Sequence, residues 1–312
     1  MATKIALLQS NPIVGDINGN AVMIQKLANL AYESGAGFAV TTELAISGYP
    51  PRDLLLQDDF ISRCHQVASD LESPIPILVG TPVPPIQDRS LPGNGVVRAG
   101  DSIREVTRKQ LLPTYDVFDE ARYFEADERP GIARTIAGVD VGVTICEDAW
   151  QHCGATPNDY DSDPIAQIAE WGRQGVLLDA TVNLSASPYH ADKSGVRIEV
   201  ARSAASSLNH PFLLANQVGG NDDLLFDGRS IIAWPDGTAV VAPAWKEGVL
   251  VADLSDPSKC IWKGEGDLVH LSPNQEFNEG DNDLLDAVIT GLSDYCRKSG
   301  IKKIVLGLSG GI

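Results

Sequence analysis

Short apolar segments typical of strands alternate with segments of helical periodicity through residues 1–254, and this alternation limits the possible fold more than any other feature. Lys4 to Gln9 and Phe38 to Thr42 are apolar runs, and the residues between them repeat apolar side chains at helical spacing. Pro235-Asp236-Gly237 predicts a hairpin turn. Strands that alternate with helices and are interrupted by hairpins predict an α/β fold, in which a mixed sheet is covered by helices.

Individual elements follow from the same signals. Asp163 followed by Pro164 predicts a helix start, because a carboxylate caps the first turn and proline fits the first helical position. We expect a helix over residues 54–71 and a buried strand over residues 176–182.

The pattern changes after Leu254 and predicts three parts: a first domain over residues 1–254, a linker over 255–281, and the start of a second α/β domain over 282–312. The linker is rich in Gly, Asn, Pro and Asp and has no sustained period. In the last part we expect a helix, a strand over residues 304–308 and a Gly-rich turn, so the chain is expected to stop inside this second domain.

Charge and composition exclude several classes of protein. The 312 residues contain 24 Lys and Arg against 42 Asp and Glu, a formal net charge of −18, which repels nucleic acid and anionic membrane surfaces. No apolar run is long enough to span a bilayer or to form a signal-peptide core. Five scattered cysteines predict reduced thiols, so we expect a cytoplasmic protein that binds neither nucleic acid nor membrane.

Cys146 is the first candidate for a catalytic residue, because it ends an apolar strand, where α/β sheets present side chains to ligand crevices. A nucleophilic thiol needs a base and a donor for the developing oxyanion. Glu43 and Lys109, each at the end of a predicted strand, can supply these groups. Taken singly, each residue is explained as well or better by a structural role, as a buried thiol, an exposed strand-end carboxylate or a solvated lysine.

We expect no metal site. Cys146, His152 and Cys153 lack the paired spacing of structural zinc sites. The acidic stretch from Asp159 to Asp163 lacks the glycine and the later glutamate of a calcium loop.

Three longer motifs occur in one order along the chain. Thr42 to Pro50 resembles the Glu motif of the nitrilase superfamily of carbon–nitrogen hydrolases, Arg108 to Phe124 resembles its Lys motif, and Cys146 to Trp150 resembles its Cys motif. The resemblance implies the four-layer α-β-β-α sandwich of that superfamily, followed here by the first helix and strand of a second α/β domain.

Further motifs narrow the resemblance to the glutaminase domain of glutamine-dependent NAD synthetases. These motifs are Asp116 to Glu120, Asn183 to Tyr189 and Asn216 to Asp222. Ser309, Gly310 and Gly311 resemble the opening of the ATP loop of the same enzymes. Asp192 departs from the family, in which a glycine is expected before Lys193.

The resemblance also implies roles for single residues. Cys146 is expected to be the nucleophile, Glu43 the general base, Lys109 the cation near the oxyanion, and Glu120 the acid that orients Lys109. Six residues match positions that line the glutamine pocket: Tyr49, Tyr115, Phe118, Trp150, Ser187 and Lys193.

The activity implied is hydrolysis of glutamine, which needs no cofactor. In a longer enzyme the released ammonia would serve the ATP- and Mg²⁺-dependent amidation of deamido-NAD, and we expect such an enzyme to be a homo-oligomer. Two alternatives remain open: an independent amidase that acts on another carboxamide, and a fragment without catalytic activity that assembles with partners.

Overall fold

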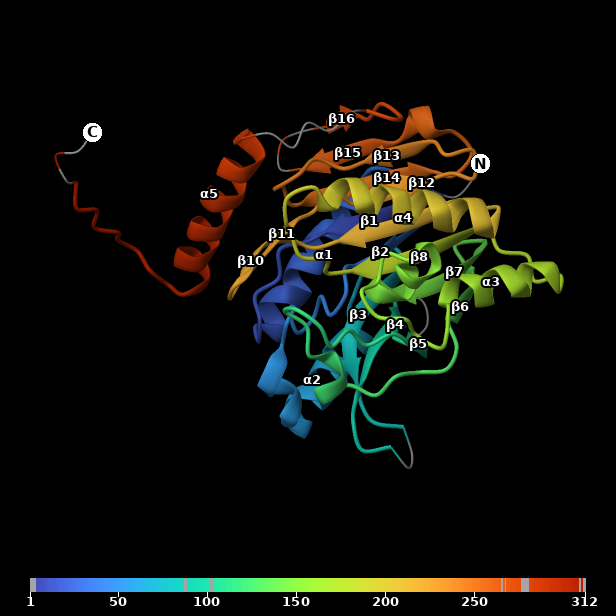
Figure 1. Ribbon diagram of the computed structural model, residues 1–312, viewed down its shortest axis with the longest axis horizontal. Coiled ribbons are helices and arrows are strands. Elements are labelled where there is room, and N and C mark those ends of the chain that lie inside the picture. The colour runs from blue at the N-terminus through green and yellow to red at the C-terminus, as the bar shows by residue number, and fades with distance from the viewer. Residues whose placement is uncertain are drawn as a thin grey trace.

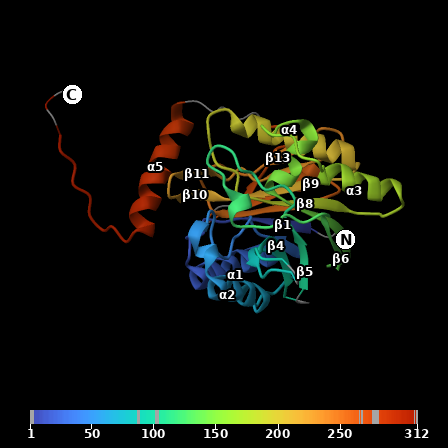
Figure 2. The ribbon, with the colours of Figure 1, turned by 60° about the horizontal axis from the view of Figure 1, so that its bottom comes forward.

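Two β-sheets stack face to face, and each carries helices on its outer side, so the layers follow in the order α-β-β-α (Figure 2). The computed structural model describes residues 4–86, 89–100, 104–264, 266, 268–275, 281–308 and 310. The predicted four-layer sandwich is confirmed.

The first sheet has eight strands, in the spatial order β16 (Leu268–His270), β15 (Ile261–Gly264), β14 (Gly248–Asp253), β1 (Lys4–Gln9), β2 (Phe38–Val40), β3 (Ile77–Val83), β4 (Gly93–Ala99) and β5 (Arg104–Arg108). The second has six, in the order β13 (Ala239–Val241), β12 (Ile231–Ala233), β9 (Phe212–Asn216), β8 (Ala180–Ser185), β7 (Val139–Ile145) and β6 (Gly131–Ile136). β10 (Val218–Asn221) and β11 (Leu224–Asp227) form a separate hairpin.

The outer layers are α1 (Ile17–Glu33) and α2 (Asp58–Ser69) on the first sheet, and α3 (Pro164–Arg173) and α4 (Lys193–Leu208) on the second (Figure 1). β1 shows how one strand serves two layers. Because successive side chains point to opposite faces, Ile5 and Leu7 join the core between the sheets, whereas Ala6 and Leu8 pack towards the helices.

Several predicted elements form with shifted bounds. The carboxylate of Asp163 accepts a hydrogen bond from the Ala166 N–H at 2.9 Å, which confirms the predicted start of α3. The helix expected over residues 54–71 is instead a 3₁₀ turn, Arg52–Leu56, followed by α2. The strand expected from Val176 begins at Ala180, because the Val176 N–H bonds back to the Trp171 carbonyl and prolongs the turn after α3.

The segment 255–281, expected as a linker without a sustained period, contains regular strands among its described residues. It contains β15 and β16, which extend the first sheet beside β14. Trp262 on β15 is almost fully buried and belongs to the core between the sheets. The strands escaped sequence analysis because each is too short to show a period.

Of the elements expected in residues 282–312, the helix is present and the strand is not. The expected helix is present as α5 (Asp281–Lys298), which lies against the β10–β11 hairpin (Figure 1). Residues 304–308, expected as a strand, are exposed, with Val305 at 94%, and pair with no other strand among the described residues. A strand needs a neighbour for its backbone hydrogen bonds, and here none lies beside it.

A buried ion network joins α4, β11 and α5. Asp227 pairs with Arg197 at 3.0 Å and with Arg229 at 2.8 Å, and Arg229 also reaches Asp283 of α5 at 2.6 Å. Arg197 and Asp227 are fully buried, so each depends on the other for compensation of its charge.

We expect Asp227→Ala to lower the free energy of unfolding by about 3–5 kcal/mol, because it leaves buried guanidinium groups without their shared carboxylate. Urea unfolding followed by circular dichroism measures this loss. Glu199→Ala, which breaks the exposed pair of Glu199 with Arg202, is the control and should cost at most about 1 kcal/mol. Equal losses in the two variants would contradict the importance of the network.

Candidate active site

Cys146 occupies a sharp turn at the end of β7. It begins the 3₁₀ turn Cys146–Ala149, is 6% exposed, and has a φ of 44°, a left-handed conformation that is strained for a residue with a side chain. The buried carboxylate of Asp148 holds this turn by accepting hydrogen bonds from the N–H groups of Ile145, Gln110 and Leu111, at 3.0, 3.0 and 2.9 Å. The residues beside Cys146 and beside Lys109 are therefore tied to one side chain.

Lys109 lies between two carboxylates in the fully buried part of the site. Its Nζ donates to Glu43 Oε1 and to both oxygens of Glu120, each at 2.8 Å. Glu43 and Lys109 are 0% exposed, and Glu120 begins the 3₁₀ turn Glu120–Arg122. The sequence placed these residues far apart, and the structure brings all three together.

Neutral hydrogen-bond donors surround the two carboxylates of this cluster. Glu43 accepts hydrogen bonds from Asn94 Nδ2 at 2.7 Å and from the Ala186 N–H at 3.1 Å. Tyr49 donates its hydroxyl proton to Glu120 Oε1 at 2.9 Å. Each carboxylate is thus held by neutral donors as well as by Lys109.

The charges of the cluster determine its resting protonation. Burial alone would lower the pKa of Lys109, but Glu120 and Glu43 raise that pKa well above its usual value. Burial and the charge of Glu43 raise the pKa of the Cys146 thiol well above its usual value, although Lys109 opposes the rise. Burial raises the pKa of Glu120 to about 7. At neutral pH Lys109 is therefore charged, and the thiol keeps its proton until a base takes it.

A cavity of about 250 Å³ opens onto Cys146. Five of the six residues that we expected in a glutamine pocket line it: Tyr115, Phe118, Trp150, Ser187 and Lys193. Tyr49, the sixth, lines a neighbouring cavity together with Glu120 and Phe118. Tyr49 thus contacts Glu120 of the cluster and does not belong to the lining of the cavity at Cys146.

Glu147 is a site residue that sequence analysis missed. It lines the cavity, is 5% exposed, and accepts hydrogen bonds from the hydroxyl groups of Tyr115 at 2.7 Å and Tyr160 at 3.3 Å. Burial raises the pKa of its carboxyl group. Its position directly after Cys146 in the motif was the one signal that could have indicated it.

The same cavity carries basic and neutral donors. Lys193 Nζ lies 5.4 Å from the centre of the Trp150 ring, and burial lowers the pKa of this lysine. The indole Nε1 of Trp150 is buried without a hydrogen-bond partner. The cavity therefore presents an acceptor, Glu147, and a cation, Lys193, to any occupant.

Asp192, the residue that departs from the family pattern, adopts a φ of 66° directly before α4. Glycine adopts this left-handed conformation without a steric penalty, and aspartate tolerates it better than most residues do. The turn before Lys193 is thus formed with aspartate in the position where glycine was expected.

The remaining candidates do not assemble into a site. Across the described ranges, no group of three or more His, Cys, Asp or Glu side chains is placed to hold a metal ion, and no helix is long and apolar enough to cross a membrane. Asp163 pairs with His152 instead. Ser309 and Gly311 lie outside the described residues, and Gly310 is an exposed bend.

Comparisons with known proteins place the chain in a family. The profile of the carbon–nitrogen hydrolase family matches residues 4–258. A glutamine-dependent NAD(+) synthetase of Synechocystis is 38% identical over 321 residues, which cover 99% of this chain and 55% of that protein. One of Xanthomonas campestris is 34% identical over 328 residues, which cover 99% and 53%. The chain thus spans about half the length of these relatives.

Solved structures show the same likeness. A glutamine-dependent NAD⁺ synthetase of Acinetobacter baumannii in complex with ADP superposes with a TM-score of 0.81 at 27% identity, covering 100% of this chain and 55% of that one. An amidase of Nesterenkonia shares the fold, with a TM-score of 0.63 at 22% identity over 81% of this chain and 90% of the amidase. The chain belongs to the carbon–nitrogen hydrolase family and aligns with about half the length of glutamine-dependent NAD⁺ synthetases.

Proposed function

We propose that this chain hydrolyses the side-chain amide of glutamine to glutamate and ammonia. The observation that carries the proposal is the buried cluster of Glu43, Lys109 and Glu120 beside Cys146, which itself lines a cavity together with Glu147 and Lys193. The first group of residues supplies thiol chemistry, and the second matches an α-amino acid.

Glu43 acts as the general base. Because the Cys146 thiol is protonated at rest, attack on the amide carbon requires that its proton moves to Glu43 as the carbon–sulfur bond forms. The negative charge that develops on the amide oxygen is stabilised by Lys109 and by the backbone N–H of Glu147. Lys109 suits this task because its neighbouring carboxylates keep it charged.

Glu43 then returns the proton to the leaving nitrogen, the carbon–nitrogen bond breaks, and ammonia departs from a thioester on Cys146. A water molecule that gives its proton to Glu43 attacks this thioester, and the proton goes to the thiolate as glutamate leaves. Glu120 touches only Lys109 and Tyr49 within this cluster, so we assign it the task of orienting Lys109.

The α-amino and α-carboxylate groups of glutamine explain the two charges of the cavity. Glu147 is the acceptor for the ammonium group, and Tyr115 holds this carboxylate in place. Lys193 and Ser187 are donors for the carboxylate. Tyr115, Phe118 and Trp150 enclose the aliphatic part between them.

In a protein of the relatives' length, we propose that the ammonia is used for ATP- and Mg²⁺-dependent amidation of deamido-NAD. This chain contributes the hydrolase half. Gly310 is the one described member of the ATP loop expected at Ser309 to Gly311, so we assign no ATP step to the described residues.

Replacing the nucleophile tests the central assignment. We expect Cys146→Ala to abolish ammonia release from glutamine, since no other group can form the thioester, while circular dichroism stays unchanged. An electrophilic glutamine analogue should label Cys146 of the wild type and leave the exposed Cys153 unmodified, as measured by peptide mass. Equal labelling of both thiols, or turnover by Cys146→Ala, would refute the assignment.

Two variants should separate chemistry from binding. Glu43→Gln removes the base, so we expect kcat to fall about 100- to 10,000-fold with little change in KM. Lys193→Ala removes a charge-assisted contact, so we expect KM to rise about 10- to 100-fold at nearly constant kcat. Steady-state ammonia release measures both constants. A panel of simple carboxamides serves as control, and preference for an amide without α-substituents would favour an amidase with another substrate.

We expect this chain to make no NAD from deamido-NAD, ATP, Mg²⁺ and ammonium. Residues 304–308, which precede the ATP loop, are exposed and form no strand, so no sheet positions that loop. Chromatographic measurement of NAD decides this, with the release of ammonia from glutamine as the control for an active preparation. Sustained NAD formation would show that a complete nucleotide site exists in this chain.

A further inference from the structure

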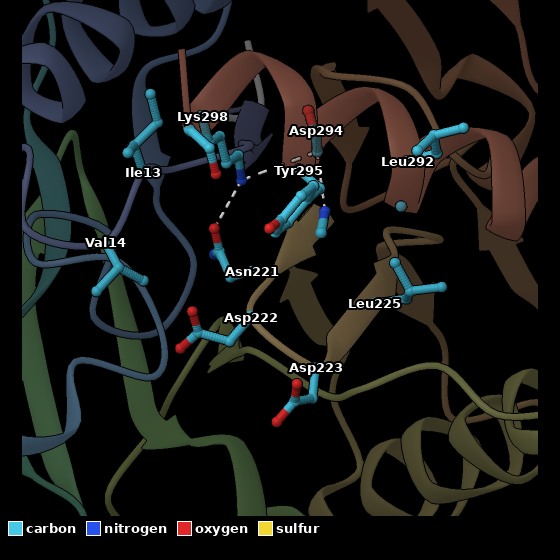
Figure 3. Close-up of a pocket in the computed structure, with 13 residues that line it drawn as sticks. Ile13, Val14, Asn221, Asp222, Asp223, Leu225, Leu292, Asp294, Tyr295 and Lys298 are labelled. Carbon is cyan, nitrogen blue, oxygen red and sulfur yellow. Dashed lines mark hydrogen bonds and ion pairs between the residues drawn. The ribbon is translucent and has the colours of Figure 1, made fainter. Parts of the chain in front are cut away.

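A line of hydrogen bonds leads from α5 to the catalytic cluster. Lys298 Nζ at the end of α5 donates to Asn221 Oδ1 at 2.7 Å (Figure 3), and Asn221 Nδ2 donates to the carbonyl oxygen of Tyr49 at 3.0 Å. The hydroxyl of Tyr49 reaches Glu120, which in turn binds Lys109. The helix is thereby connected to the cation of the active site.

The orientation of the Asn221 amide is determined by its two partners. A lysine ammonium only donates, and a carbonyl oxygen only accepts, so the amide oxygen must face Lys298 and the amide nitrogen must face Tyr49. Asn221 ends β10 and is only 5% exposed, so its amide group depends mainly on these two protein partners. Each hydrogen bond of Asn221 therefore depends on the other.

α5 is held at this end by several additional contacts. Asp294 accepts hydrogen bonds from the Gly220 N–H and from Asn11 Nδ2, both at 2.8 Å, and Lys298 also donates to Asn11 and Pro12. A cavity of about 520 Å³ between α5 and the hairpin is lined by Asn221, Asp294 and Lys298 (Figure 3). The helix is thus hydrogen-bonded to the hairpin at Lys298, and a cavity separates helix and hairpin beside this contact.

We propose that Asn221 is a positioning residue of the hydrolase, which transmits the docking of α5 through Tyr49 and Glu120 to Lys109. This inference rests on the proposed function. Asn221 holds the backbone of Tyr49, Tyr49 sets the direction of Glu120, and Glu120 holds the ammonium group that meets the oxyanion. When Lys298 leaves Asn221, this support loosens and turnover falls.

Asn221→Asp tests the inference with little change of shape. The new carboxylate still accepts from Lys298, but it cannot donate to the Tyr49 carbonyl. We expect kcat to fall about tenfold, less than the ~100-fold that a 1 Å misplacement can cost, and KM for glutamine to stay within about twofold. Asn18→Asp on the exposed face of α1 adds the same charge and should leave both constants unchanged.

A double-mutant cycle with Tyr49→Phe separates positioning from a general structural effect. If Asn221 acts through the Tyr49 hydroxyl, Asn221→Asp should lower kcat by less than about twofold in the Tyr49→Phe background. If Asn221 only supports the fold, the full loss of about tenfold should recur there, and the proposal is overturned. Lys298→Met removes the partner of the Asn221 amide oxygen, and the same two outcomes apply when it is combined with Tyr49→Phe. It replaces Asn221→Asp if that variant fails to fold.

The rate at which iodoacetamide alkylates Cys146 is measured on the same variants by peptide mass. Alkylation requires that Glu43 takes the thiol proton, yet it does not require glutamine. A wild type that releases no ammonia from glutamine would refute the proposed function alone, because the alkylation cycle would still show whether Asn221 and Tyr49 are coupled. Additive effects on alkylation would refute the coupling alone.

Discussion

The site depends on the ion pairs that the buried ammonium group of Lys109 makes with two carboxylates. The two carboxylates, Glu43 and Glu120, lie within 2.8 Å of it, and its charge compensates theirs in a part of the protein that water does not reach. The neutral donors Asn94 and Tyr49 stabilise the carboxylates further. In the proposed reaction this cluster keeps a base and a cation beside a thiol that stays protonated until substrate arrives.

Both sheets contribute to this cluster, so their packing sets its geometry. Glu43 and Lys109 follow β2 and β5 of the first sheet, whereas Cys146 follows β7 of the second. The backbone N–H of Ala186, which follows β8, donates to Glu43 across the two sheets at 3.1 Å. Asp148 makes the corresponding connection from the turn of Cys146 to the residues after Lys109. The packing of the two sheets on each other thus fixes the positions of Glu43, Lys109 and Cys146 relative to one another.

The β10–β11 hairpin gives α5 two routes to the site. One route runs from Lys298 through Asn221 to Tyr49, and the other runs from Asp283 through the buried arginines towards Ser187 in the cavity wall. Whatever packs against α5 therefore acts on an element that is joined to both the catalytic cluster and the substrate cavity. Hydrogen bonds and ion pairs thus connect α5 to the hydrolase fold.

The sequence by itself determined the α/β class and most strands and helices, because burial patterns are local. Glu43, Lys109 and Cys146, which taken singly had structural explanations, were indicated only by the resemblance of three motifs to a family. Only the tertiary structure decided that β15 and β16 extend the first sheet, that residues 304–308 form no strand, and that Tyr49 faces Glu120. Periodicity shows which face of an element is buried, but it does not show what covers that face. Contacts such as that between Lys298 and Asn221 join residues far apart in the chain, so their energies exist only after the layers have packed.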